Sequence, residues 1–170
     1  MELKNSTIVV VEPTIDDWIH VKSIWEDPAT MHDVGGIHEL PFEKYQNWFS
    51  KMFEEKKKGN KYFLIFDADR HTCLGEISFH RYDPKTQKAM FNIKIKAESR
   101  NKGVAFQAMD MLFEYYFNQW KGKIIEDAVW EKNKNGLEKL KNYGFQEVRR
   151  EEDGIVLELD RERWIEKRKT

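Results

Sequence analysis

A chain of 170 residues is long enough to bury one core. Its net charge of −1 is too small to attract it to nucleic acid or to a membrane surface. The single Cys73 excludes an internal disulfide framework and favours a reducing compartment. No apolar run is long enough to span a bilayer, and residues 1–5 lack the apolar segment of a signal peptide. We therefore expect one cytoplasmic domain over residues 1–170.

The first third of the chain predicts one strand followed by two helices. Residues 7–12 are mostly β-branched and apolar, which is typical of a strand. Residues 14–26 carry apolar side chains at helical spacing behind a capping-box pattern, and Pro28 closes this helix. A second helix starts at Pro41 with an aromatic stripe that we assign to the core, and the lysines at 56–58 compensate the dipole at its end.

The connection between these helices, residues 31–40, contains two histidines, two acidic residues and a glycine pair. Two interpretations stay open: a mobile loop beside a substrate, or a passive polar connection. Histidine and carboxylate side chains are metal ligands, but no tight ligand spacing supports a site, so we expect no metal.

The rest of the chain predicts a meander of strands, followed by helices and strands in alternation. Three strands, at 62–66, 73–81 and 90–96, follow the second helix and are separated by short turns. After a helix that starts at Val104, we expect a strand, a short helix, two strands and a charged tail, at 123–130, 135–142, 145–149, 154–159 and 161–169. The order β-α-α-β-β-β-α-β-α-β-β favours an α/β (α+β) fold with one mixed, mostly antiparallel sheet and helices on both faces.

The most informative stretch is the junction between the strand at 90–96 and the helix that begins at Val104. Apolar residues alternate in the strand, and the period becomes helical beyond the junction. The first N–H groups of a helix are unpaired and lie at its positive dipole end, so they can bind an anion. Gly103 leaves room for a close approach, while Arg100 and Lys102 add positive charge. An ordinary strand-to-helix loop could have the same residues, so both interpretations stay open on pattern alone.

The pattern Arg100-x-x-Gly103-x-Ala105 resembles the Arg/Gln-x-x-Gly-x-Gly/Ala loop of the GNAT superfamily of N-acetyltransferases. In that family the loop amides hold the pyrophosphate of coenzyme A, and the sheet splays beside the preceding strand, which pairs with the pantetheine arm. The resemblance implies acetyl-coenzyme A as co-substrate and direct acetyl transfer to a primary amine in a ternary complex. The implied cofactor-binding residues on strand and loop are Ile93, Lys94, Ile95, Arg100, Asn101, Lys102, Gly103, Val104 and Ala105.

A second block of the same family resembles Val129-x-x-x-Asn133 together with the later pair Gly144-Phe145. In the family this asparagine commonly contacts the pantetheine arm, so Asn133 joins the implied cofactor site. An asparagine that caps a turn or helix is the alternative. Residues 25–36 are similar to the ribosomal-protein N-terminal acetyltransferase branch. This similarity implies that the acceptor is either a small amine or a protein N-terminus. Exposed aromatic side chains could serve a homodimer face.

The usual proton donors of the family are absent from their positions in this sequence. Leu140 stands where many members have tyrosine, and Gly136 stands where the ribosomal branch often has serine. As proton acceptor we expect Glu76 first, Glu126 second and His80 third. Glu76 and His80 share one side of the strand that should pair with the junction strand, and a histidine titrates near neutrality.

Two further functions stay open from the sequence. A coenzyme A-binding or nucleotide-binding module without transferase activity would agree with the missing proton donors. A nucleic-acid-binding domain could use Arg100 and Lys102, but the near-zero net charge and the lack of an aromatic-basic motif weigh against it. The acceptor amine is not determined, because a fold does not fix its substrate.

Overall fold

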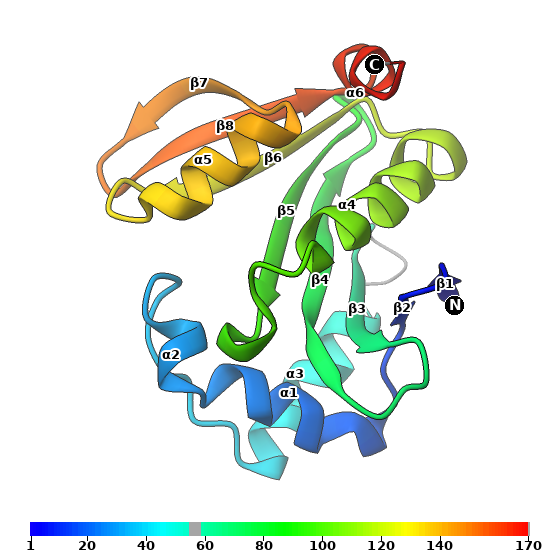
Figure 1. The fold of residues 1–170 in the computed structure, drawn as a ribbon, viewed down its shortest axis with the longest axis vertical. Coiled ribbons are helices and arrows are strands. Elements are labelled where there is room, and N and C mark those ends of the chain that lie inside the picture. Colours follow the sequence, from blue (N-terminus) through cyan, green and yellow to red (C-terminus); the bar gives the residue numbers. More distant parts are fainter. Residues whose placement is uncertain (55–58, 170) are drawn as a thin grey trace.

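The computed structural model describes residues 1–54 and 59–169, so the lysines at 56–58 lie outside the described residues (Figure 1). Within these residues, eight strands form one sheet in the order β1-β2-β3-β4-β5-β6-β8-β7. The strands are β1 (Glu2–Lys4), β2 (Ile8–Val11), β3 (Lys61–Asp67), β4 (Cys73–Asp83), β5 (Lys88–Ile95), β6 (Ile124–Trp130), β7 (Gln146–Glu151) and β8 (Gly154–Asp160). Neighbours are antiparallel except β5 and β6, which confirms the predicted mixed, mostly antiparallel sheet.

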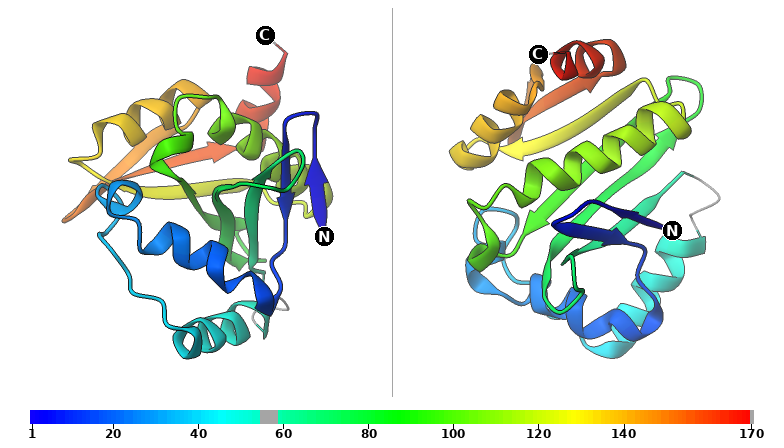
Figure 2. Two further views of the ribbon diagram at one scale, coloured as in Figure 1. Left: turned by 60° about the horizontal axis from the view of Figure 1, so that its bottom comes forward. Right: turned by 45° about the vertical axis from the view of Figure 1, so that its right-hand side comes forward.

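Helices cover both faces of this sheet, as the sequence predicts (Figures 1 and 2). The helices are α1 (Trp18–Trp25), α2 (Pro28–Met31), α3 (Phe42–Glu54), α4 (Val104–Glu114), α5 (Lys134–Tyr143) and α6 (Arg161–Arg168). α4 and α5 bury their apolar residues on one face, and α1 and α3 bury theirs on the other. A 3-10 turn, Ala97–Ser99, precedes α4, and a π-helical turn, Tyr115–Gln119, follows it.

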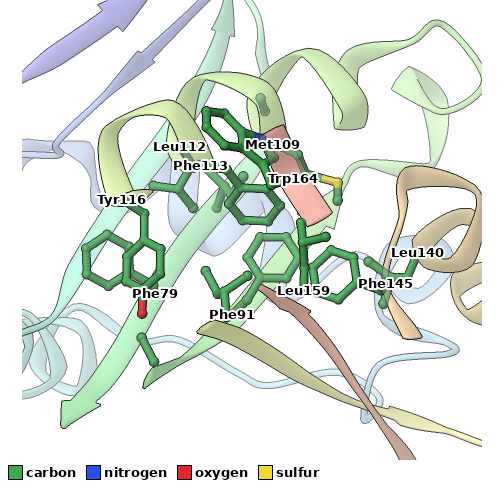
Figure 3. Close-up of a cluster of buried hydrophobic side chains, with 14 of the residues drawn as sticks. Phe79, Phe91, Met109, Leu112, Phe113, Tyr116, Leu140, Phe145, Leu159 and Trp164 are labelled. Carbon is green, nitrogen blue, oxygen red and sulfur yellow. The ribbon is translucent and has the colours of Figure 1, made fainter. Parts of the chain in front are cut away.

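The core between the sheet and α4 contains a group of packed aromatic side chains (Figure 3). Phe91 of β5 lies 5.1 Å from Phe113 of α4 between ring centroids, and Phe79 of β4 lies 4.9 Å from Tyr116. Such edge-to-face pairs contribute about 0.5–1.5 kcal/mol beyond the apolar area that they bury. The first contact holds β5 against α4, and the second holds β4 against the π-helical turn that follows α4, so packing helps to fix the turn between β5 and α4.

Two elements near the N-terminus were not predicted. β1 is short and charged, and its backbone pairs with β2 although its residues carry no strand pattern. α2 begins at Pro28, which the sequence indicates only as the end of a helix. The side chain of Asp27 accepts a hydrogen bond from the Thr30 N–H at 3.3 Å and caps this turn, with proline in the first position.

The charged tail forms a helix, α6, that the residue pattern did not reveal. Asp160 caps it, since its Oδ1 accepts the Arg163 N–H at 2.7 Å. The ring of Trp164 packs 5.2 Å from that of Phe117, so one aromatic residue anchors an otherwise polar helix. None of the helices in the described part of the chain has the length and apolar character needed to cross a bilayer.

The feature that positions the site is the short contact between β5 and β6. The two strands pair only from Lys88 to Met90 on the β5 side. Beyond this point β5 continues beside β4 as far as Ile95, while β6 continues beside β8 as far as Trp130. The sheet therefore opens into a V, which is visible in Figure 1, and the splay implied by the family resemblance is present.

Candidate active site

A cavity of about 430 Å³, which we call the β5–β6 cavity, lies where the two strands diverge. Its strand residues are His80 of β4, Met90, Phe91, Asn92, Ile93, Lys94 and Ile95 of β5, and Asp127, Ala128, Val129 and Trp130 of β6. Residues near its ends include Thr30, Asp33, Val34, Arg100, Ala105, Phe106, Asn133, Gly136 and Lys139. The cavity thus brings together much of the implied cofactor site, and the loop at 31–40 borders it.

The turn into α4 depends on two residues with left-handed backbone conformation. Asn101 has φ of 61° and Gly103 has φ of 76°. Gly103 is the N-cap of α4 and offers no side chain to the first N–H groups of the helix. A Cβ at Gly103 would meet only Gln107 Nε2, at 3.8 Å, so the space before these amides is open. The helix start can therefore receive an anion at its positive end.

Arg100 lines the cavity, but its guanidinium is held by backbone carbonyl groups. Nε donates to the Ile95 oxygen at 3.1 Å, and Nη2 donates to the Thr30 oxygen at 2.9 Å. The side chain therefore ties α2 to the end of β5. The sequence indicated its positive charge and could not indicate this bridge, because Thr30 is 70 residues away.

Asn133 serves as a helix cap at the edge of the same cavity. Its Oδ1 accepts the Gly136 N–H at 2.9 Å, so the alternative of a capping asparagine is realised in the structure. A Cβ at Gly136 would lie 2.6 Å from Asn133 Nδ2, so only glycine leaves this side chain where it is. A contact between Asn133 and a bound cofactor remains a prediction.

A second cavity of about 220 Å³, the β4–β5 cavity, lies on the sheet face covered by α1 and α3. Polar residues line up across three strands here, because Tyr62 pairs with Ser78 and Ser78 pairs with Asn92. The lining residues are Trp25, Trp48, Met52, Asn60, Tyr62, Glu76, Ser78, His80, Arg81, Asn92 and Lys94. Three of them also line the β5–β6 cavity, namely His80, Asn92 and Lys94, so the two cavities meet along β5.

Glu76, the first expected proton acceptor, is buried at 3% exposure with donors on both carboxylate oxygens. Oε1 accepts from Lys94 Nζ at 3.0 Å. Oε2 accepts from Trp25 Nε1 at 2.9 Å and from the hydroxyl of Tyr62. Burial, followed by the charge of Glu76, raises the pKa of Tyr62 well above its usual value, so this phenol stays protonated. The arrangement suits a residue that holds Lys94 and Trp25 in place better than one that takes a proton.

Glu126, the second expected acceptor, lines neither cavity. Its carboxylate is paired with Arg149 at 2.9 Å and with Lys88 at 3.2 Å. Burial acts to raise the pKa of Glu126, but the hydrogen bonds from Arg149 and Lys88 outweigh it and hold the pKa below its usual value. Glu126 therefore acts as the centre of an ion-pair group between β5, β6 and β7.

His80 and Asp127 are the titratable groups best placed to take a proton. His80 lines both cavities, and burial, followed by the charges of Arg81 and Lys94, lowers its pKa below 6.5. Asp127 lines the β5–β6 cavity. Burial raises the pKa of its carboxyl to about 7, against the opposing effects of the Ala128 N–H and Lys94. Both groups can accept a proton near neutral pH.

Asp127 was not predicted as a site residue, although the sequence contains a signal for it. Ile125 and Val129 are buried in the core, so strand alternation places Asp127 on their face of β6 and Glu126 on the opposite face. A carboxylate between two buried apolar positions should not stay solvated. The missing information was that β5 leaves β6 at this point and opens a cavity beside it.

Other candidate groups lie outside the two cavities. The hydroxyl of Tyr143 donates to Asp110 Oδ1 at 2.7 Å. Cys73 is buried, which raises the pKa of its thiol to about 11 and makes it a poor acyl carrier. In the described part of the chain, no three histidine, cysteine or acidic side chains gather as a metal site.

Comparison with known proteins supports one family. Residues 7–146 match the model described as "Acetyltransferase (GNAT) domain". No curated protein sequence matches the chain significantly.

Among solved structures, spermidine N-acetyltransferase from Vibrio cholerae, in complex with CoA and spermine, has a TM-score of 0.83 at 16% identity over 95% of this chain and 99% of that chain. Ribosomal-protein-S5-alanine acetyltransferase from Vibrio fischeri has a TM-score of 0.83 at 14% identity, over 96% and 98%. Apo FdhC, a nucleotide-linked sugar GNAT, has a TM-score of 0.85 at 14% identity, over 99% and 94%. At these identities the likeness shows a shared fold.

Proposed function

Because the chain belongs to the GNAT family of acetyltransferases, we propose that it moves an acetyl group from acetyl-coenzyme A to a primary amine by direct transfer. The observation that carries this proposal is the V between β5 and β6, with the open start of α4 at one end. An extended, anionic thioester substrate needs a strand edge for its arm and a positive site for its phosphates. The β5–β6 cavity offers both.

Each end of the cavity suits a different part of acetyl-coenzyme A. The unpaired N–H groups at the start of α4, beyond Gly103, suit the pyrophosphate. The edge of β5 at Ile93, Lys94 and Ile95 suits the pantetheine arm, and a backbone N–H on this edge can stabilise the oxyanion that forms on the thioester carbon. Lys139 adds a further cation to the wall.

The transfer requires one proton to leave the amine and one to reach the thiolate. The neutral amine attacks the thioester carbonyl, a C–N bond forms and the C–S bond breaks. Asp127 and His80 are better placed than Glu76 to take the amine proton, because donors already engage both oxygens of Glu76. Leu140 lines the cavity where many family members have tyrosine, so water protonates the leaving thiolate.

For the acceptor we propose only a broad class, and we also propose a cellular location and an oligomeric state to be tested. The similar structures include one enzyme named for spermidine and one named for a ribosomal protein, which supports a small amine or a protein N-terminus as acceptor. A buried, unreactive cysteine agrees with a cytoplasmic location. Fractionation of cells that express the chain tests the location, and light scattering of the purified protein tests for a homodimer.

A thiol-release assay with acetyl-coenzyme A and a panel of amines tests the function. We expect amine-dependent release of coenzyme A and acetylated product by mass spectrometry. Tight binding of acetyl-coenzyme A without release for any amine would support the alternative, a coenzyme A-binding module without transferase activity. Salt-sensitive oligonucleotide binding without thiol release would support a nucleic-acid-binding domain instead.

A further inference from the structure

The β4–β5 cavity lies where an acceptor amine would have to lie, and its side chains indicate which amines it takes. It meets the β5–β6 cavity at His80, Asn92 and Lys94, so a molecule in it can present an amine to the strand that holds the thioester. This inference rests on the proposed acetyl transfer and concerns the substrate class for that same site.

One wall of this cavity is rigid and apolar. Trp25 and Trp48 lie 5.2 Å apart between ring centroids, and Trp48 lies 4.8 Å from Tyr62. Two hydrogen bonds to Glu76 fix the outer rings, one from Trp25 Nε1 and one from the Tyr62 hydroxyl. In a cavity of about 220 Å³, such a wall suits a compact apolar or aromatic body rather than a long flexible chain.

The charges of the cavity are unfavourable for a polycation. Glu76 is the one carboxylate among the described residues that line it, and Lys94 already neutralises it at 3.0 Å. Arg81 is an exposed second cation, and in the described part of the chain its guanidinium has no ion pair. Two cations against one anion leave an excess of one positive charge around the cavity.

We propose that the acceptor is a small amino carboxylic acid with an apolar or aromatic side chain, and that Arg81, the cation that Glu76 does not neutralise, binds its carboxylate. Arginine binds a carboxylate through parallel N–H bonds, so Arg81 supplies direction as well as charge. The body of the acceptor packs on Trp25 and Trp48.

Matched acceptors isolate the carboxylate in the thiol-release assay. Phenylalanine, phenylalaninamide and phenethylamine share one body, and leucine with leucinamide forms a second pair; spermidine represents polyamines. We expect kcat/KM at least about tenfold higher for each acid than for its amide, and no measurable turnover with spermidine. The α-amine of each amide is less basic than that of the acid and is more often neutral. Amine basicity alone would therefore favour the amide, so it cannot produce a preference for the acid.

Variants assign the preference to the cavity. Arg81→Gln should lower the acid-to-amide ratio of kcat/KM about tenfold, towards one. Arg150→Gln, an exposed arginine on β7 outside both cavities, should leave that ratio unchanged. Turnover of amides or spermidine at rates equal to or above those of the acids would overturn the acceptor class and leave acetyl transfer standing. An absence of thiol release with every amine would overturn both.

Discussion

Glu126 and Asp127 are consecutive carboxylates on β6 whose environments shift their pKa values in opposite directions. Burial acts on both side chains, but hydrogen bonds from Arg149 and Lys88 outweigh it at Glu126 and keep that carboxyl ionised. Asp127 faces a cavity with little compensation, and its pKa rises to about 7. Two neighbouring acids with separated pKa values can divide structural and catalytic roles.

At Asp127, substitution by Asn removes the proposed proton acceptor while keeping the shape of the side chain. We expect turnover to fall about 10²-fold or more, with the affinity for acetyl-coenzyme A unchanged. The wild-type pH–rate profile should rise through about pH 7, as Asp127 ionises, and this limb should vanish in Asp127→Asn. If the profile of Asp127→Asn still rises, but at a pH below 6.5, then His80 is the group that accepts the amine proton.

The stability of Asp127→Asn shows whether the variant is folded and whether the carboxyl is buried. A raised native pKa means that the native state binds more protons than the unfolded state between about pH 4 and pH 7. Wild-type stability therefore falls as pH rises through this window. Asn removes the penalty of ionisation, so its melting temperature should exceed that of the wild type at pH 8 and match it below pH 4. Equal melting temperatures at both pH values would contradict the burial argument.

Gly103 tests the anion site at the start of α4. Gly103→Glu and Gly103→Gln share the same backbone strain at φ of 76° and nearly the same bulk, but only Glu adds a negative charge. We expect the Glu variant to bind acetyl-coenzyme A at least about tenfold more weakly than the Gln variant, which is about 1.4 kcal/mol by calorimetry. Equal affinities in the two folded variants would remove the anion site.

At the scale of elements, Asn133, the N-cap of α5, has two candidate roles. Asn133→Ala removes the cap and should lower stability by about 1 kcal/mol, while Asn133→Ser retains a capping hydroxyl. If Asn133 also contacts acetyl-coenzyme A, KM for that substrate should rise in both variants. A normal KM in Asn133→Ser, with a loss only in Asn133→Ala, would show that capping is the whole role.

The approach of β4 to β5 depends on Gly75. A Cβ there would lie 2.2 Å from the Lys94 carbonyl oxygen, so the wall of the β5–β6 cavity would have to move. Gly75→Ala should lower the free energy of unfolding by about 1–3 kcal/mol in urea denaturation. Gly36→Ala is the control, since its φ is +79° but no atom lies within 4 Å of the added Cβ. A smaller loss at Gly75 than at Gly36 would contradict the packing argument.

The sequence predicted elements well where local pattern determines them. The change from period 2 to period 3.6 places β5, the turn and α4, and Phe91 and Phe113 are buried as expected. β1 was missed because pairing with β2, rather than its own residues, stabilises it.

The roles within the site depend on contacts between distant parts of the chain, so they could not be predicted in the same way. Glu76 was predicted to be the proton acceptor, but Trp25 and Tyr62 reach its carboxylate from α1 and β3. Arg100 meets Thr30 across 70 residues, and Asp127 faces a cavity that exists only because two strands diverge.

For the whole molecule, we propose that residues 1–170 form one domain, since strands from both ends of the described chain share one sheet. Thermal unfolding should then be a single transition that coincides by circular dichroism and tryptophan fluorescence. Acetyl-coenzyme A at 100 times its Kd should add about 2.7 kcal/mol, or about 5–11 °C in Tm. Two separated transitions would contradict a single domain.

The V between β5 and β6 also gives the protein an edge in the middle of its sheet. Past Met90, the side of β5 that faces β6 has no strand partner in the described part of the chain, and β6 has the same exposed side facing it. Unpaired strand edges are templates for β-augmentation and aggregation, and proteins usually keep them short, charged or covered. Because this enzyme must leave the edge open for its substrate, the edge is covered only while the substrate is bound. The free form should therefore self-associate at lower concentrations than the acetyl-coenzyme A complex, and cellular cofactor supply would act as protection against misassembly.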